Sequence, residues 1–161
     1  RKVILDVNNI AMDKITEALL YAASRRQHLI EVVIPYLEDG YIVLCDRYID
    51  SSLAYQGHAR NIGVDEVYQI NQFATDGLLP DLTVYIDVTP EVGLNRIVCN
   101  NRNQNRLDLE SINFHHLVYE GYAKVKNMFP DRFKVVNGEQ DIKTVNEEVA
   151  DVILKYVENL Q

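Results

Sequence analysis

The amino-acid sequence predicts an α/β fold in which helices cover both faces of a parallel sheet. Two short, nearly continuous apolar runs, residues 41–45 and 82–88, have the pattern of strands buried on both faces. Residues 133–136 form a third predicted strand, and segments with helical periodicity separate the three. Strands joined through helices pair in parallel with right-handed crossovers. Because ligands of such sheets bind beyond the carboxyl ends of the strands, we expect functional residues directly after each run.

The first predicted element is a long amphipathic helix. Apolar residues follow helical spacing over residues 14–37, and Asp13 precedes them as a plausible N-cap. Gly40 is expected to close the helix. Pro35 is expected to kink the last turn or to end the helix early, because proline removes a backbone donor.

The later elements alternate between strands and helices. In chain order they are a strand at 41–45, helices at 51–60 and 64–76, a strand at 82–88, a helix opened by Pro90, a helix at 112–127, a strand at 133–136 and a helix at 142–156. Thr89 is expected to cap the helix at Pro90, since proline is well suited to the first helical position. Residues 100–105 are polar without periodicity and predict a loop.

Length and charge limit the classes of partner. The chain has 161 residues, a length typical of one domain with a sizeable core. Its net charge of −8 argues against nucleic acid or an anionic membrane as the main partner. No apolar run approaches the roughly 20 residues of a membrane span, and the N-terminus lacks a signal-peptide pattern, so the cytoplasm is expected.

The cationic residues indicate a phosphate ligand. Every one of them between Lys14 and Lys124 is an arginine. Arginine offers a planar, permanently charged fork for phosphate or carboxylate, whereas lysine is the usual residue on a solvated surface. Ordinary surface ion pairs are the alternative explanation. These arginines are Arg25, Arg26, Arg47, Arg60, Arg96, Arg102 and Arg106.

Helical spacing separates the first two arginines. Tyr21 and Arg25 lie four residues apart on one face, where a ring and a guanidinium could stack on and hydrogen-bond a planar heterocycle. A half-buried tyrosine beside a salt-bridged arginine explains the pair equally well. Arg26 is interpreted as structural, because within an apolar stripe its charge needs a buried carboxylate or an interface partner. That stripe contains Ile15, Leu19 and Ile30.

A family resemblance begins in residues 44–56, which read LCDRYIDSSLAYQ. This segment resembles the signature of the thymidylate kinase family at every defined position. Asp-Arg-Tyr after a strand would be weak by itself, but Ser-Ser-Leu-Ala-Tyr-Gln at fixed spacing is highly specific. Residues 21–25 look like the Phe-x-x-x-Arg helix of bacterial members, residues 60–63 resemble the stretch after the signature, and residues 101–108 look like their arginine-bearing LID.

The resemblance implies a nucleoside monophosphate kinase-like fold of the P-loop class, as a single domain over residues 1–161 with a LID loop at about 99–109. It implies transfer of the ATP γ-phosphoryl group to dTMP, which gives dTDP for dTTP biosynthesis. Mg²⁺ is the implied cofactor, and a cytoplasmic homodimer is the implied assembly. ATP and dTMP are therefore the expected partners, while nucleic acid and membranes are not.

Four residues are implied to act on phosphates. Arg47 would clamp the dTMP phosphate and meet the charge that develops during transfer. Asp46 would hold Mg²⁺ through water or orient Arg47. Arg102 and Arg106, on the LID, would close over the ATP phosphates and exclude water.

Five residues are implied to hold the nucleoside of dTMP. Tyr21 would stack on thymine, and Arg25 would donate to a base carbonyl. Gln56 or Ser52 would pair with the N3 edge of the base. Tyr55 would pack near the sugar, where its ring could disfavour a 2′-hydroxyl.

The adenine contact is assigned to Asn137 and Gly138, which resemble the corresponding loop of the family.

Two departures from the family pattern stand out. Tyr21 replaces the usual Phe, and its hydroxyl needs a partner. The GxxxxGK[ST] phosphate loop is not found in these residues, where glycines are scattered and no Gly-Lys pair occurs, so we expect it upstream of Arg1.

Two alternatives stay open at this point. Another deoxynucleotide or deoxynucleoside kinase of similar fold is one, although the run at residues 51–56 favours dTMP. A non-catalytic nucleotide-binding domain is the other, if Arg1 is the natural start. Without a phosphate loop, residues 1–161 alone are expected to lack kinase activity and to fold poorly.

Overall fold

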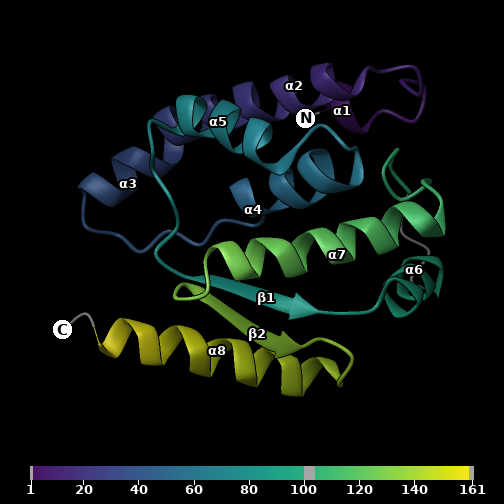
Figure 1. Cartoon of the computed structure of the whole chain (residues 1–161). Helices are drawn as coiled ribbons and strands as arrows, with labels where there is room; N and C mark the ends of the chain where they lie inside the picture. The colour runs from purple at the N-terminus through teal and green to yellow at the C-terminus, as the bar shows by residue number, and fades with distance from the viewer. Residues whose placement is uncertain (1, 100–103, 160–161) are drawn as a thin grey trace. The chain divides into compact units, whose positions relative to one another are not determined.

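The computed structural model describes residues 2–99 and 104–159 (Figure 1), and the chain divides into two compact units. The first unit comprises residues 1–79 and 103–125, and the second comprises residues 80–102 and 126–161. Within the described residues, helices build the first unit and both strands lie in the second. None of the helices described combines the length and apolar character that crossing a membrane requires.

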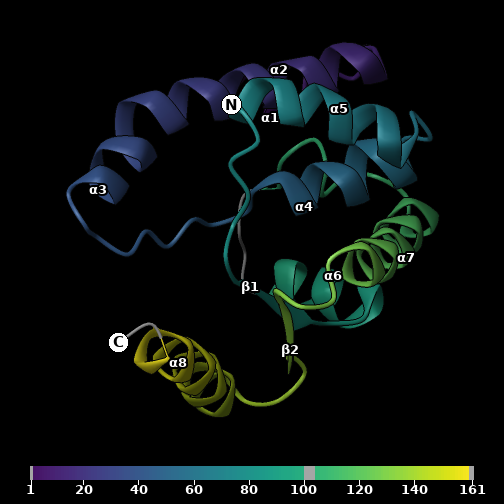
Figure 2. The same ribbon diagram turned by 60° about the vertical axis from the view of Figure 1, so that its left-hand side comes forward.

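The first unit packs around α2 and the helical segment that carries the signature. Its elements are α1 (Lys2–Leu5), α2 (Lys14–His28), the π-helix η1 (Leu29–Val33), α3 (Ile34–Glu38), α4 (Ile49–Ser52), the π-helix η2 (Leu53–Ala59), α5 (Val64–Thr75) and most of α7 (Ile112–Met128). Helix α5 lies beside α2 in both views and also contacts η2 (Figure 2). Ile49, Leu53 and Val67 are fully buried between these helices.

The long N-terminal helix is confirmed, with a change of form near its end. The Asp13 carboxylate accepts hydrogen bonds from the backbone N–H groups of Ile15 and Thr16, both at 3.0 Å, and so caps α2 as predicted. The helix continues without a break into η1 and α3, which ends at Glu38. Pro35 has no N–H to donate, and the turn before it takes the wider π form.

The predicted strand at residues 41–45 is wrong. The segment is irregular, and its apolar side chains lie in solvent, with Tyr41, Ile42 and Leu44 exposed by 60%, 62% and 75%. Neither strand in the described part of the chain pairs with it. A lone extended segment forms no ladder of hydrogen bonds. The Tyr41 N–H instead donates to the Tyr36 carbonyl at 2.9 Å.

The face that α2 buries is not the stripe of bulky apolar residues. Ile15, Leu19 and Ile30 are each about half exposed, and Arg26 is exposed beside them. The buried positions include Glu17 together with two alanines, Ala18 and Ala22. Small side chains let neighbouring helices approach closely, which accounts for the inward orientation of this face.

The second unit contains a small parallel sheet with helices. Its two strands are the second and third of the three strands that the sequence predicts. Strand β1 (Thr83–Asp87) pairs in parallel with β2 (Phe133–Asn137), and the register runs from Thr83 opposite Phe133 to Asp87 opposite Asn137. Helix α6 (Pro90–Cys99) begins at the predicted proline, and α8 (Ile142–Glu158) packs on β2. The fold is therefore mixed α/β with a small parallel sheet.

Candidate functional site

The signature segment turns sharply at Arg47. Its φ of 65° lies in the left-handed region, which residues other than glycine seldom adopt. Helix α4 begins two residues later at Ile49. The exposed guanidinium of Arg47 lies 5.1 Å from the ring centroid of Tyr55 and donates to its hydroxyl at 3.3 Å. Backbone strain of this kind occurs often at functional sites, and here it directs a cation into solvent.

Arg25 is anchored on the other side of the same segment. Its guanidinium donates to the Ser52 hydroxyl at 2.8 Å, to the Tyr48 carbonyl at 3.2 Å and to the Asn71 side-chain oxygen. Burial lowers the pKa of Arg25 from its ordinary value. Three of the five N–H donors are thus engaged, and the other two have no acceptor among the residues that the structure describes.

Gln56 is joined to α2 at a second point. Its side-chain amide nitrogen donates to a carboxylate oxygen of Glu17 at 2.7 Å, and both side chains are buried. Glu17, Tyr21 and Arg25 follow one another at four-residue intervals along α2, as do Ser52 and Gln56 along α4 and η2. Two hydrogen-bonded pairs, Glu17 with Gln56 and Arg25 with Ser52, therefore connect α2 to the segment of α4 and η2. Tyr21 lies midway between Glu17 and Arg25 along α2.

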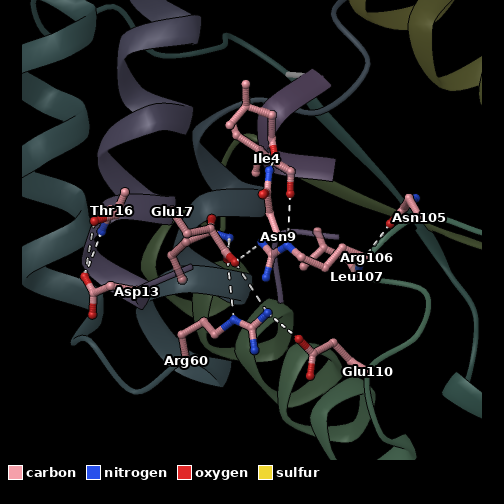
Figure 3. Close-up of polar contacts among 12 residues, drawn as sticks. Ile4, Asn9, Asp13, Thr16, Glu17, Arg60, Asn105, Arg106, Leu107 and Glu110 are labelled. Carbon is pink, nitrogen blue, oxygen red and sulfur yellow. Dashed lines mark hydrogen bonds and ion pairs between the residues drawn. The ribbon is translucent and has the colours of Figure 1, made fainter. Parts of the chain in front are cut away.

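Glu17 is also the centre of a buried ion-pair cluster (Figure 3). Arg106 pairs with Glu17 and donates through Nε to the Ile4 carbonyl at 3.0 Å. Arg60 lies 3.4 Å from Glu17 and pairs with Glu110 as well. Burial acts to raise the pKa of Glu17, but hydrogen bonds from Arg106 and Gln56 and the nearby arginine charges outweigh it and lower the pKa. The carboxylate is therefore ionised at neutral pH.

Helix α7 supports the signature segment from a further side. Tyr122 and Ser51 share a hydrogen bond of 2.8 Å, and burial raises the pKa of Tyr122 to about 12. Gly121 packs directly on the backbone of Ala54, where a Cβ atom would lie 2.8 Å from the carbonyl oxygen. The close approach requires glycine at this position and fixes the helix that carries Tyr55.

The second unit carries polar groups at the ends of its strands. The Gly138 N–H donates to the Asp87 carbonyl at 2.8 Å, and a Cβ atom on Gly138 would lie 2.4 Å from a methyl group of Val88. Arg96 donates to the Gly138 carbonyl at 2.6 Å. Asn137 is exposed at the end of β2. The loop after β2 thus packs tightly on the end of β1.

The sequence-predicted site residues fall into three groups. The first unit contains the predicted dTMP residues and the exposed Asp46, and it joins Arg25 to Ser52 and Arg47 to Tyr55. It also contains Arg106, whose guanidinium faces Glu17. Asn137 and Gly138 belong to the second unit, and Arg102 lies outside the described residues. The predicted dTMP residues are Tyr21, Arg25, Arg47, Ser52, Tyr55 and Gln56.

Sequence reasoning missed Glu17 and Asn71. Glu17 lies one helical turn before Tyr21, so an acidic residue on the face of Tyr21 and Arg25 was the available signal. Asn71 lies in α5 and has no comparable local signal. It orients Arg25 because its own nitrogen donates to the Val67 carbonyl at 2.7 Å, which leaves its oxygen to accept.

These features define a class of protein. An exposed arginine on a strained turn suits a phosphate, and an anchored arginine among hydroxyl and amide groups suits a planar base. Parallel strands with polar loops at their carboxyl ends are typical of α/β proteins that bind nucleotides. The fold and site are thus those of a nucleotide-binding α/β protein.

Comparison with known proteins identifies the family. The thymidylate kinase family profile matches residues 1–149. A thymidylate kinase of Clostridium novyi (strain NT) is 60% identical over 150 residues, which are 92% of this chain and 73% of the relative. Thymidylate kinases of Bacillus licheniformis and Oceanobacillus iheyensis are 56% and 52% identical, over 95% and 98% of this chain and 73% and 70% of the relatives. The chain belongs to the thymidylate kinase family, which confirms the resemblance in residues 44–56.

Proposed function

We propose that the first unit of this chain binds dTMP for the reaction of its family, the phosphorylation of dTMP to dTDP with ATP. Membership of the thymidylate kinase family supplies the reaction. The arrangement of the helical segment over residues 49–59 carries the assignment of the dTMP site. This segment bears Ser52, Tyr55 and Gln56, and through Ser52 and Tyr55 it also holds Arg25 and Arg47.

The base of dTMP is assigned to the side between α2 and this segment. Arg25 retains N–H donors for a base carbonyl, and the bonds to Ser52 and Asn71 keep its guanidinium in place. Gln56 or Ser52 pairs with the N3 edge. Tyr21 supplies the stacking ring, and Tyr55 packs near the sugar.

The phosphate of dTMP is assigned to Arg47. Its exposed guanidinium can approach the phosphate with both arms of its fork and stabilise the charge that develops in transfer. Asp46, also exposed, would hold Mg²⁺ through water. A single carboxylate fits this ion, which keeps several waters and binds substrate phosphates instead of an all-protein cage. The described residues contain no cluster of three or more candidate metal ligands.

The ATP contacts complete the proposal. Arg102 and Arg106 close over the ATP phosphates as part of a LID at about residues 99–109, and Asn137 and Gly138 contact adenine. Both units belong to one kinase domain of the P-loop nucleoside monophosphate kinase type, with helices on both faces of its sheet, and the enzyme works in the cytoplasm. The tight packing of Gly138 on the end of β1 supports a fixed adenine loop.

Calorimetry with dTMP and dCMP tests the base contacts. We expect the full-length protein to bind dTMP more tightly by about 10-fold or more, because the cytosine amine reverses the hydrogen-bond pattern offered by Arg25 and Gln56. The control is Gln27→Ala, which changes an exposed glutamine on α2 whose side chain donates to Glu31. Equal affinity for the two nucleotides would remove Arg25 and Gln56 from the base site.

The homodimer is assigned to the exposed apolar face of α2, η1 and α3. Ile15, Leu19, Ile30 and Leu37 recur at intervals of four, eleven and seven residues and are 41–51% exposed. An apolar stripe of this length facing solvent is typical of a protein interface, and a two-fold dimer buries the same stripe from both copies. Arg26, within the stripe, would then find its partner across the interface.

Leu19→Glu tests this interface. We expect the wild-type protein to sediment as a dimer and the variant as a monomer, because each dimer would bury two added carboxylates without partners. Leu154→Glu is the matched control, since it changes a leucine that is 60% exposed on α8. Analytical ultracentrifugation gives the mass, and a dimer that persists in Leu19→Glu argues for another interface.

A further inference from the structure

We propose that Glu17 is a positioning residue for substrate selection. It fixes which way the side-chain amide of Gln56 faces, so that Gln56 presents its oxygen to the base and selects a base with a hydrogen on N3. The inference rests on the proposed contact between Gln56 and the base. Gln56 makes the contact that distinguishes the bases, and Glu17, a buried carboxylate on α2, determines the orientation of Gln56.

The first step concerns the direction of one hydrogen bond. An ionised carboxylate only accepts hydrogen bonds, whereas a primary amide donates through nitrogen and accepts through oxygen. Gln56 must therefore turn its nitrogen toward Glu17, and the two lie 2.7 Å apart. The opposite orientation would place the amide oxygen against the carboxylate in a site where Glu17 is 1% and Gln56 2% exposed. Burial makes that unpaired arrangement costly.

The second step concerns what keeps Glu17 ionised and in place. Arg106 pairs with Oε2, and Arg60 donates to both carboxylate oxygens, to Oε2 at 3.4 Å and to Oε1 at 3.5 Å (Figure 3). Gln56 makes the shorter contact with Oε1, at 2.7 Å. The same arginines and Gln56 lower the pKa of Glu17. The carboxylate is thus held as an acceptor throughout the neutral pH range, and it cannot rotate without losing several bonds.

The third step concerns the free end of Gln56. With its nitrogen on Glu17, the side-chain oxygen receives no hydrogen bond from any of the described residues. An acceptor at this position matches the N3–H of thymine or uracil. It opposes the N3 of cytosine, which is itself an acceptor, and leaves two unpaired polar atoms at a buried contact.

A second amide, that of Asn71, is oriented in the same way beside Arg25, eight residues after Glu17 on α2. The Asn71 nitrogen donates to the Val67 carbonyl at 2.7 Å, so its oxygen must face Arg25 and accept from it. In both places a protein acceptor takes the amide nitrogen and leaves the amide oxygen in a defined direction. The amides of Gln56 and Asn71 contact Glu17 and Arg25, which lie four residues before and after Tyr21 on α2. The hydrogen-bonding groups proposed to face the base are therefore held in place before a ligand binds.

Glu17→Gln in the full-length protein tests the proposal, with dTMP and 5-methyl-dCMP as probes. These nucleotides differ only at the N3 and C4 positions of the base. Glutamine at position 17 can donate as well as accept, so Gln56 becomes free to turn over. We expect the ratio of the two dissociation constants, measured by calorimetry, to fall by about 10-fold or more from its wild-type value. An unchanged ratio overturns the proposal.

Two further variants separate orientation from structural support. Glu17→Asp keeps an acceptor-only carboxylate, so it should retain most of the wild-type ratio even where both affinities fall. Partial unfolding lowers both apparent affinities by the same factor and leaves the ratio unaffected. If Glu17→Gln does not fold, Glu17→Gln combined with Arg60→Gln restores the charge balance of the cluster and is expected to show the same reduced ratio.

Gln56→Ala distinguishes this inference from the proposed base contact. If Gln56→Ala lowers the ratio and Glu17→Gln does not, the base contact stands and the role of Glu17 is refuted. If Gln56→Ala leaves the ratio unchanged, Gln56 does not read the base, and the contact and the inference fail together. A lowered ratio in both Gln56→Ala and Glu17→Gln, with the ratio retained in Glu17→Asp, supports the proposal.

Discussion

Arg47→Lys should lower kcat by about 10²-fold or more while raising the KM for dTMP much less. Lysine keeps the positive charge but loses the planar fork, which we propose to meet the charge on the phosphate as it develops in the transition state. Steady-state kinetics with ATP and dTMP on the full-length protein measure both constants. Other phosphoryl-transfer enzymes lose about 10³ to 10⁵ in rate when such an arginine is removed. A smaller loss of about 10²-fold therefore fits a substitution that keeps the positive charge.

The backbone at this position makes the comparison clean. Arg47 has a φ of 65°, and a lysine there carries the same steric cost, so the substitution changes the head group and not the turn. The guanidinium contact with Tyr55 is lost, and Tyr55→Phe reports separately on the hydrogen bond. Lys155→Arg, which changes the head group of a cation 70% exposed on α8, serves as the control and should leave kcat unchanged. Near-normal turnover in Arg47→Lys would make Arg47 structural.

Locally encoded elements of the fold were predictable from the sequence. Asp13 caps α2 through its own side chain, and Pro90 is the first residue of α6, as predicted. Asp76 ends α5 in the left-handed conformation beside Gly77, as the Asp-Gly pair predicts. Each signal lies within a few residues of the boundary it determines, so one sequence is sufficient to locate it.

The segment at residues 41–45 shows where such reasoning fails. Its apolar run has the composition of a buried strand, but a strand exists only where another backbone pairs with it. Pairing partners are set by the whole fold, and β1 pairs with β2 across some fifty residues of chain. Composition alone could not show that the run at 41–45 stays unpaired among the described residues.

The site was predicted only in part for a related reason. The signature gave Arg47, Ser52, Tyr55 and Gln56 because these residues are close in sequence. Glu17 acquires its role from Arg106, which lies 89 residues away. Helical spacing leaves two faces of α2 that could be buried. The face with Glu17 is stable in the interior because Arg106 and Arg60 pair with its carboxylate.

Arg106→Ala should destabilise the protein by about 3 kcal/mol, because it removes one partner of a buried ion pair and opens space beside Glu17. For a protein of this size the loss corresponds to a fall in melting temperature of about 6–12 °C. The same variant should raise the KM for ATP if Arg106 leaves Glu17 for the phosphates when ATP binds. Thermal melts without ligand and ATP kinetics at saturating dTMP separate the two effects.

The pH dependence of that loss identifies the ion pair as its cause. The folded protein holds the pKa of Glu17 below its ordinary value of 4.5, so the pairing stabilises the fold above that value and is lost as the pH falls through the folded pKa. The gap in melting temperature between wild type and Arg106→Ala should therefore be full at pH 7 and shrink below pH 4.5. Lys155→Ala, which removes an exposed cation paired with Asp151 at 2.7 Å, should melt close to wild type. A gap that stays constant with pH would assign the loss to packing of the arginine stem and not to its charge.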